Sequence, residues 1–473
     1  MLTIGHCITQ WGNLRHPKGP LMKMLLIFAF TILSAYAQDN DVTHRPKSFA
    51  YQGANAVFVD FEEAIYDITY DIDKKKAEVI AKFKMNVVEA GYPIFDLIQE
   101  PTLVKVDGLE VNAPEVSTPS NETKIRVINK KLSIGRYDLE IQVPLTNLIE
   151  YTTTGVKSAY WVTDLQDRNY LERYIPVNLE YDRVKMTFNI NFKGLKTKQH
   201  LFANGLVKWT TDQKATIDFP EYFTVNSLYF HTTPVGEVEL LETTFKSVNG
   251  REIPVAVYQV PEDSDPEGLN GLKNVALRVF NELEKDYGAF PHPSITIYNA
   301  NLGSMGLGGM EYAGATVTSK SALAHELFHS YFARAMTPAN GNAGWIDEAL
   351  ASWRDDGYPR LVTLSGTSSM AAHAPYTRKT DTAAYGFGAR FMSFLDNKFA
   401  SKGGLKPFMN KLLEKKIFEP LFTEDFIQEM ELFYGEKVQD MFNKYVYGKP
   451  QKLKSAQFHL HRKISGVELR SIL

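Results

Sequence analysis

Apolar and polar residues alternate with a period of two along the first half of the chain. The pattern is clearest at 66–72 and 77–87, which are separated by a polar turn at 73–75, and it returns at 137–143 and 184–192. Strict alternation is typical of antiparallel strands that bury one face and leave the other in water. Several such strands between Gly, Pro, Asn and Asp turns predict a β-sandwich-like domain.

The period changes to that of a helix after about residue 245. Apolar residues recur at helical spacing over Leu272–Tyr287 and stop at Gly288, a residue type that often ends helices. A short strand is expected at 294–300, before a glycine-rich segment at 303–314. Further helices are expected at 389–399, 405–416, 423–434 and 437–445. Thr423 is the expected N-cap of the third of these.

The change of period predicts a multidomain α+β protein. We expect an N-terminal antiparallel β domain at 38–240 and a mixed α/β domain with a helical C-terminal half at 241–450. A basic tail at 451–473 has no diagnostic pattern. The chain has 473 residues, of which 44 % are apolar and 23 % charged, a composition that is typical of globular proteins of several domains.

The N-terminus has the pattern of a signal peptide. An apolar run at Met24–Ala37 follows Lys18 and Lys23 and ends in Ala-Tyr-Ala, a small-x-small cleavage site. The run has 14 residues and is too short for a comfortable membrane span. We therefore expect 1–37 to be a leader and the mature protein to be exported, periplasmic or extracellular in a bacterium. An uncleaved anchor is the alternative.

Loss of the leader would change the charge and the cysteine content. It would remove Arg15, Lys18 and Lys23 and no acid, which changes the net charge from −3 to −6. No basic stripe favours nucleic acid or an anionic membrane, and no second apolar stretch is long enough to span a bilayer. Cys7 is the only cysteine, so the mature protein would have no disulfide. The oligomeric state stays open.

A His-Glu-Leu-Phe-His motif gives the strongest chemical signal. Residues four apart share a helix face, so His325 and His329 can present their imidazoles to one ion. Glu326 lies next to that face, where it can act as a general base on a water that the ion activates. Glu348 adds a carboxylate, and two His, one Glu and an open position are typical of catalytic zinc. The alternative is a chance match on an amphipathic helix, which the spacing of Glu348 disfavours.

A glycine-rich segment precedes this motif, and Glu311 in it lies 14 residues before His325. Gly308 and Gly309 would let the backbone approach a ligand closely. Extended over Met310 and Glu311, the segment could pair with a peptide substrate as an added strand. Glu311 could then supply the counter-charge for a substrate ammonium group. A glycine-rich turn with a surface Glu is the alternative.

A tyrosine beyond the metal motif is a further candidate. A phenol O–H aimed at the tetrahedral oxyanion of peptide hydrolysis would stabilise it. The local sequence alone does not separate Tyr385 from Tyr376 for this role. His292 and His373 are interpreted as surface or loop histidines, because three metal ligands are already present.

These pieces, in this order, resemble the aminopeptidase N family of gluzincin zinc metallopeptidases over about residues 60–450. The family has an N-terminal β domain, a Gly-x-Met-Glu-Asn exopeptidase motif, HExxH with a distant Glu, and Tyr in a Tyr-x-x-Gly-Ala setting. The counterparts here are Gly308–Tyr312, His325–Glu348 and Tyr385–Ala389. The resemblance implies a thermolysin-like catalytic domain that binds one zinc ion.

The resemblance implies a role for the metal and catalytic candidates. His325, His329 and Glu348 would bind zinc. Glu326 would activate the water, and Tyr385 would stabilise the transition state.

The resemblance also implies a substrate site made by Gly308, Gly309, Met310 and Glu311, in which Glu311 binds the free α-amino group. Tyr312 stands where the family usually has Asn. The expected activity is hydrolysis of N-terminal residues from peptides. A zinc endopeptidase of the same fold and a non-catalytic peptide-binding homologue are the alternatives. The sequence lacks the large C-terminal helical domain of many members, so a more open site is expected.

Overall fold

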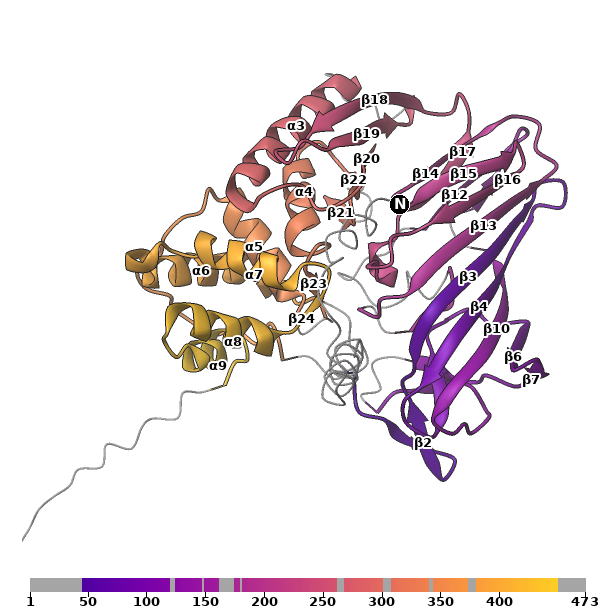
Figure 1. Ribbon diagram of the computed structural model, residues 1–473, viewed down its shortest axis with the longest axis horizontal. Helices are drawn as coiled ribbons and strands as arrows, with labels where there is room; N and C mark the ends of the chain where they lie inside the picture. Colours follow the sequence, from indigo (N-terminus) through magenta and orange to yellow (C-terminus); the bar gives the residue numbers. More distant parts are fainter. Residues whose placement is uncertain are drawn as a thin grey trace, which may run out of the picture. The chain divides into compact units, whose positions relative to one another are not determined.

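The computed structural model describes the chain from residue 45 to residue 449 with several gaps (Figure 1). The described ranges are 45–119, 124–146, 149–160, 174–178, 181–261, 268–300, 308–339, 343–372 and 380–449. The described residues from Arg45 onward belong to one compact unit. The expected leader at 1–37, the tail at 451–473, His373 and Tyr376 lie outside the described residues.

An eight-stranded sheet dominates the first half of the described chain. Its strand order is β15-β16-β13-β3-β4-β10-β6-β7. The bounds, in that order, are Leu206–Thr211, Lys214–Asp218, Lys185–Lys193, Asp60–Asp71, Lys76–Val87, Gly135–Leu145, Leu103–Val106 and Leu109–Glu110.

The central strands of this sheet confirm the period-two pattern. Every second residue over most of β3 and β4 is buried, including Tyr66, Ile68 and Tyr70. The pairs β3–β4 and β4–β10 are antiparallel, as expected. β13 pairs with β3 in parallel, so the expectation of antiparallel strands is wrong for this pair. Alternation reports that one face is buried and carries no information on strand direction.

Two smaller sheets complete the β-rich region. One has the order β1-β2-β5-β9-β8, with bounds Phe49–Tyr51, Ala54–Val57, Tyr92–Phe95, Lys124–Val127 and Glu115–Ser117. The other has the order β11-β12-β17-β14, with bounds Ile149–Tyr151, Val156–Tyr160, Phe230–Pro234 and Gln199–Ala203. One hydrophobic cluster contains Phe95, Phe188 and Phe230 and so joins the three sheets, as a sandwich-like arrangement requires.

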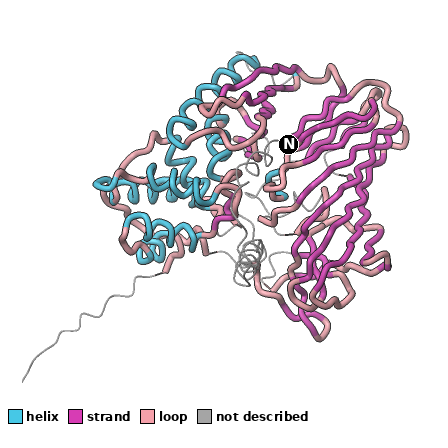
Figure 2. Tube along the Cα trace, viewed as in Figure 1, coloured by secondary structure: helices cyan, strands magenta, loops and turns pink. Residues whose placement is uncertain are grey.

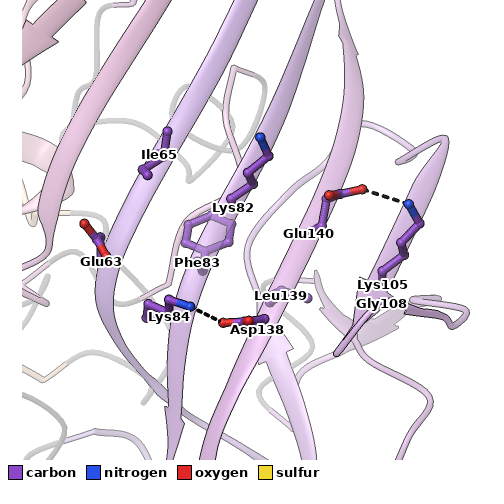
Figure 3. Close-up of a pocket in the computed structure, with 10 residues that line it drawn as sticks. All are labelled: Glu63, Ile65, Lys82, Phe83, Lys84, Lys105, Gly108, Asp138, Leu139 and Glu140. Atoms are coloured by element: carbon purple, nitrogen blue, oxygen red, sulfur yellow. Dashed lines mark hydrogen bonds and ion pairs between the residues drawn. The ribbon is translucent and has the colours of Figure 1, made fainter.

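The solvent face of the large sheet has a shallow hollow of about 320 Å³ over β3, β4, β10 and β6 (Figure 3). Lys84 donates to Asp138 at 2.6 Å and Lys105 donates to Glu140 at 3.0 Å, each across neighbouring strands. Opposite charges on neighbouring strands favour the pairing that places them side by side. These charges therefore support the strand register.

A second five-stranded sheet follows in the chain, with the order β18-β19-β20-β22-β21. The bounds, in that order, are Glu239–Lys246, Glu252–Gln259, Ile295–Asn299, Ala315–Thr318 and Gly309–Tyr312. β19, β20 and β22 are parallel, and β21 is an antiparallel edge strand. All five residues of β20 are buried, because Ile295 and Ile297 pack in the helical core while Tyr298 packs in the core of the β-rich region.

Seven α-helices lie in the described part of the mixed region (Figure 2). They are α3 (Gly268–Tyr287), α4 (Leu323–Phe332), α5 (Trp345–Asp355), α6 (Ala383–Lys398), α7 (Lys406–Lys416), α8 (Thr423–Tyr434) and α9 (Gln439–Tyr445). Short elements between them are 3-10 helix η5 (Ala400–Lys402) and the strand pair β23 (Thr337–Pro338) and β24 (Pro420–Leu421). The expected fold class, a β-rich region followed by a mixed region with a helical C-terminal half, is confirmed.

Helix boundaries agree with the sequence at α3, α7, α8 and α9 within about two residues at most ends and differ at α6. α6 begins six residues before the expected start at 389, because packing against α5 overrides the low helix propensity of Gly386 and Gly388.

The domain boundary expected at 240/241 falls inside one compact unit and stays a prediction. Within the described residues, no helix is both long and apolar enough to cross a membrane.

The expected N-cap of α8 is wrong by one residue. Phe422 is the cap, and its N–H donates to the Asp425 carboxylate at 3.3 Å. Thr423 is the first helical residue, and its hydroxyl accepts a hydrogen bond from the Trp345 indole N–H at 3.1 Å. The Thr423 side chain therefore ties α8 to α5, since Trp345 begins α5.

Close contact between α5 and α6 depends on a glycine. A Cβ at Gly388 would lie 2.7 Å from Ala349 Cβ, whereas a Cβ at Gly386 would meet nothing within 4 Å. Missing and small side chains let two helix backbones approach closely. Gly388 thus sets how near α6 lies to the first two turns of α5.

We expect Gly388→Ala to lower the free energy of unfolding by about 1–3 kcal/mol through overpacking against Ala349. Gly386→Ala is the matched control on the same helix, and it should leave stability unchanged or raise it by up to about 1 kcal/mol through helix propensity. Chemical denaturation followed by circular dichroism measures both. Equal effects of the two substitutions would contradict this account of the helix contact.

Candidate active site

The residues of the metal motif lie on α4, as their spacing predicts. α4 packs against α3, α5, β21 and β22. Its apolar residues Leu327, Phe328 and Tyr331 are buried in the helical core, which leaves a second face of the helix for His325 and His329. The two imidazole rings have centroids 4.8 Å apart, so helix geometry brings both histidines to one place.

Glu348 joins the two histidines from the first turn of α5. Its Oε2 lies 3.1 Å from His325 Nε2 and 3.6 Å from His329 Nε2. Two donors that share a zinc ion at about 2.1 Å each lie at most about 4.2 Å apart. The donor set, two imidazole nitrogens and one carboxylate oxygen, and its spacing therefore fit one zinc ion.

The close approach of these side chains shifts the pKa values of His325 and Glu348. Burial would lower the pKa of His325, but hydrogen bonds to Asp355 and Glu348 outweigh it and raise that pKa to about 11. Burial would raise the pKa of Glu348, but the nearby His329 and His325 hold it well below its usual range. Without a metal, a proton on His325 thus offsets the charge of the Glu348 carboxylate. A divalent cation would take the place of that proton.

Glu326 lies beside the histidines and is buried. Burial, followed by the charge of Glu311, raises the pKa of Glu326 well above its usual value. A Cβ at Gly309 would lie 2.5 Å from the Glu326 carboxyl carbon. The glycine in β21 therefore makes room for the Glu326 side chain, so the close approach expected at Gly309 is to Glu326.

The strand period divides β21 into two faces. Gly309 lies against Glu326, and Glu311 brings a carboxylate oxygen into a group with Glu326 and His329 whose candidate ligand atoms all lie within 4.8 Å of one another. Met310 and Tyr312 are buried in the hydrophobic cluster of the β-rich region. Tyr312 packs against Tyr229. Tyr312, which stands where the family usually has Asn, therefore lies on the core face of β21.

Tyr385 lies in the first turn of α6 and reaches the same group. Its hydroxyl donates to Glu348 Oε1 at 2.7 Å, while Glu348 Oε2 faces the two histidines. The ring is stacked 6.4 Å from that of His325. Because Gly388 holds α6 close to α5, the tyrosine and the carboxylate meet.

Comparisons with known proteins agree with this architecture at the level of fold. No family model matches the chain, and no curated protein sequence matches it. An M1 zinc metallopeptidase from Deinococcus radiodurans, a mutant bound to a Tyr-Ser-Ala substrate, matches with a TM-score of 0.59 at 14 % identity over 83 % of this chain and 95 % of that one. The chain has the fold of the M1 zinc metallopeptidases. The resemblance inferred from the motifs is confirmed in this respect.

Two further structures of this M1 fold extend the comparison. Leukotriene A4 hydrolase from Saccharomyces cerevisiae matches with a TM-score of 0.62 at 14 % identity, over 89 % of this chain and 72 % of that one. Aminopeptidase A from Legionella pneumophila, in complex with aspartic acid, matches with a TM-score of 0.63 at 12 % identity, over 85 % of this chain and 51 % of that one. Identities this low establish the M1 fold and leave the activity to be argued from the site.

Two residues of the site were not predicted from the sequence. Asp355 Oδ2 lies 2.6 Å from His325 Nδ1 and orients the imidazole. Arg334 Nη2 lies 2.6 Å from Glu311 Oε1. Asp355 is seven residues beyond Glu348, which is two helical turns, so its helix face could have indicated it. Nothing local to Arg334 indicates its partner, because β21 and the segment after α4 meet only in the fold.

His292, interpreted as a surface or loop histidine, lies in the loop between α3 and β20 but not at the surface. Its side chain is fully buried, with Nε2 2.8 Å from the Ser330 carbonyl oxygen. Burial lowers the pKa of His292 to about 4, so the ring is neutral and donates from Nε2 to that carbonyl. Aromatic neighbours, including Phe290 at 5.5 Å, surround it. His292 thus supports the backbone of α4 from the core.

We expect Asp355→Asn to weaken zinc binding by about 10–100-fold, because the carboxylate fixes the tautomer and orientation of His325. Asp356→Asn is the matched control, since Asp356 is the neighbouring exposed acid and should leave zinc affinity unchanged. Competition with a chromophoric chelator measures both affinities. A loss of the same size in the two variants would assign the effect to net charge.

Proposed function

We propose that the protein is an exported zinc aminopeptidase that hydrolyses N-terminal residues from peptides. The observation that carries this proposal is the convergence of His325, His329 and Glu348 with the buried carboxylate of Glu326 beside them. Three donors with a neighbouring base are the arrangement of a catalytic zinc site. The M1 fold supports the same proposal, since the similar structures include a metallopeptidase bound to a tripeptide and an aminopeptidase.

The chain's own residues would share the work of peptide hydrolysis. A zinc ion held by His325, His329 and Glu348 would polarise the scissile carbonyl and lower the pKa of a bound water. Glu326 would accept the proton of that water and pass it to the leaving amine. The raised pKa of Glu326 suits a group that must both accept and return a proton.

Tyr385 is proposed to stabilise the oxyanion of the transition state. Its hydroxyl contacts the outer oxygen of Glu348 at 2.7 Å, so it lies next to the proposed metal site. A phenol O–H that is already held next to the reacting group can stabilise developing negative charge through a preorganised hydrogen bond. Tyr385 would exchange its contact with Glu348 for one with the substrate.

Glu311 is proposed to bind the α-ammonium group of the substrate. Its carboxylate lies beside Glu326 and His329 on the edge strand β21. The backbone of Gly308 and Gly309 would line the substrate cleft. The distance from this charge to the metal would then limit cleavage to the first peptide bond.

One observation favours a zinc endopeptidase as a second candidate. Glu311 already has a cation, since Arg334 contacts it at 2.6 Å. If this pairing satisfies Glu311 fully, internal peptide bonds would be cleaved as well. Mass spectrometry of the products separates the two candidates, because an aminopeptidase releases single residues from one end.

Export and the cleavage of residues 1–37 belong to the same proposal. They rest on the leader pattern, which lies outside the described residues. Cell fractionation and N-terminal sequencing of the mature protein test this part independently of the activity.

Glu326→Gln should retain zinc and the fold but lower kcat by about 10²–10⁴-fold, since the amide is isosteric and cannot accept a proton. Hydrolysis of a panel of aminoacyl substrates measures the loss, and elemental analysis with circular dichroism provides the controls. Full hydrolysis by a zinc-loaded Glu326→Gln protein would exclude the proposed mechanism.

Gly309→Ala should lower kcat by about 100-fold, because its methyl group would displace the Glu326 carboxylate and misplaced groups lose about this much rate. Gly386→Ala is the matched control, since a Cβ there would meet nothing within 4 Å, and it should retain most activity. Zinc content should be unchanged in both variants. An equal loss of kcat in the two variants would contradict the proposal that Gly309 makes room for Glu326.

A further inference from the structure

We propose that Arg334 is a positioning residue that fixes the distance between Glu311 and the metal-binding helix, and so makes the enzyme select free N-termini. The inference rests on the proposed function and names what sets its specificity. Arg334 lies two residues beyond the end of α4, and its side chain spans from there to β21.

Arg334 holds both the side chain and the backbone of Glu311. Nη2 donates to Glu311 Oε1 at 2.6 Å, and Nε donates to the Glu311 carbonyl oxygen at 3.3 Å. Both side chains are at most 5 % exposed. A rigid guanidinium fork that binds two atoms of one residue fixes the direction of its carboxylate.

The backbone of Arg334 is anchored to the proposed metal site. Its N–H donates to the carbonyl oxygen of His329 at 2.9 Å. The same residue therefore contacts a proposed zinc ligand through its main chain and the proposed amine-binding carboxylate through its side chain. Removal of one residue from a peptide requires a constant separation of these two groups, and Arg334 is the link between them.

The charge of Arg334 also stabilises the buried carboxylate of Glu311 that would bind the substrate ammonium group. Glu311, Glu326 and Glu348 are three buried carboxylates in one region, and a buried carboxylate needs a cation or hydrogen-bond donors to offset its lost solvation. Arginine stays charged under all ordinary conditions. The guanidinium contacts Oε1 of Glu311, and Oε2 is the oxygen that a substrate ammonium would use.

The alternative is that Arg334 cancels the charge of Glu311 and so weakens its attraction for an ammonium group. The two roles predict opposite changes in the preference for a free amine when Arg334 is removed. If Arg334 positions Glu311, its loss lowers the preference for a free amine. If Arg334 cancels the charge, its loss raises that preference. The anchoring to His329 and to the Glu311 backbone favours the first, since mere charge compensation needs neither contact.

The test compares kcat/KM for one peptide with a free N-terminus and the same peptide with an N-acetyl group. The zinc-loaded full-length protein, Arg334→Gln, Arg334→Lys, Glu311→Gln and the double variant Glu311→Gln/Arg334→Gln are measured. Arg126→Gln is the control for loss of a buried arginine, since Arg126 is 2 % exposed and binds backbone carbonyls in the β-rich region. Zinc content and circular dichroism establish that each variant is loaded and folded.

Arg334→Gln should lower the free-to-acetylated ratio by about 10–100-fold, the value of a hydrogen bond to a charged group. The loss should appear mainly as a higher KM for the free peptide. Glu311→Gln should give the same loss, and the double variant no further loss. Arg334→Lys should restore part of the ratio, and Arg126→Gln should leave it unchanged.

A ratio that is unchanged or raised in folded, zinc-loaded Arg334→Gln overturns the inference. If that variant does not fold, an unchanged ratio in both Arg334→Lys and Glu311→Gln overturns it equally. A wild-type enzyme that hydrolyses both peptides at the same rate also overturns it and leaves the peptidase in place. If the wild-type protein hydrolyses no peptide, the proposed function itself fails.

Discussion

The structure around the site depends on the pairing of buried charges. Glu311, Glu326 and Glu348 are at most 6 % exposed, and an ionised carboxylate out of water is costly unless it meets a cation or hydrogen-bond donors. Arg334 meets Glu311, and the histidines meet Glu348. Burial, followed by the charge of Glu311, raises the pKa of Glu326 well above its usual value. Two carboxylates are thus held by partners, and the third is the one proposed to transfer the proton.

Such pairing is possible only because the elements that carry the charges approach closely. Gly309 leaves room for Glu326 beneath β21, and Gly388 faces Ala349 where α6 crosses α5. A methyl group at either glycine would lie under 3 Å from its neighbour. Close packing makes such overlaps costly. Small residues therefore set the distances at which the charged side chains meet.

The sequence predicts most of the fold class and the members of the metal group, because period and motif spacing are local. His325 and His329 follow from one helical turn, and β3 follows from alternation of buried and exposed residues. The parallel pairing of β13 with β3 was not predictable, since alternation does not encode direction. The contact of Arg334 with Glu311 was not predictable either, because it joins segments that only the tertiary structure brings together.

The β-rich region takes part in the site by bracing its edge strand. Tyr312 enters the core of that region beside Tyr229. The amide of Asn204 donates to the Ala313 carbonyl at 2.8 Å, and its oxygen accepts from the Tyr229 N–H at 2.9 Å. An edge strand has one unpaired side, and among the described strands β21 pairs with β22 alone. Since alternate residues of β21 face opposite sides, the contacts that fix Tyr312 in the core also fix the direction of Glu311. The β-rich region and Arg334 therefore hold the proposed amine-binding residue from two sides, which explains why one short strand carries both core and site residues.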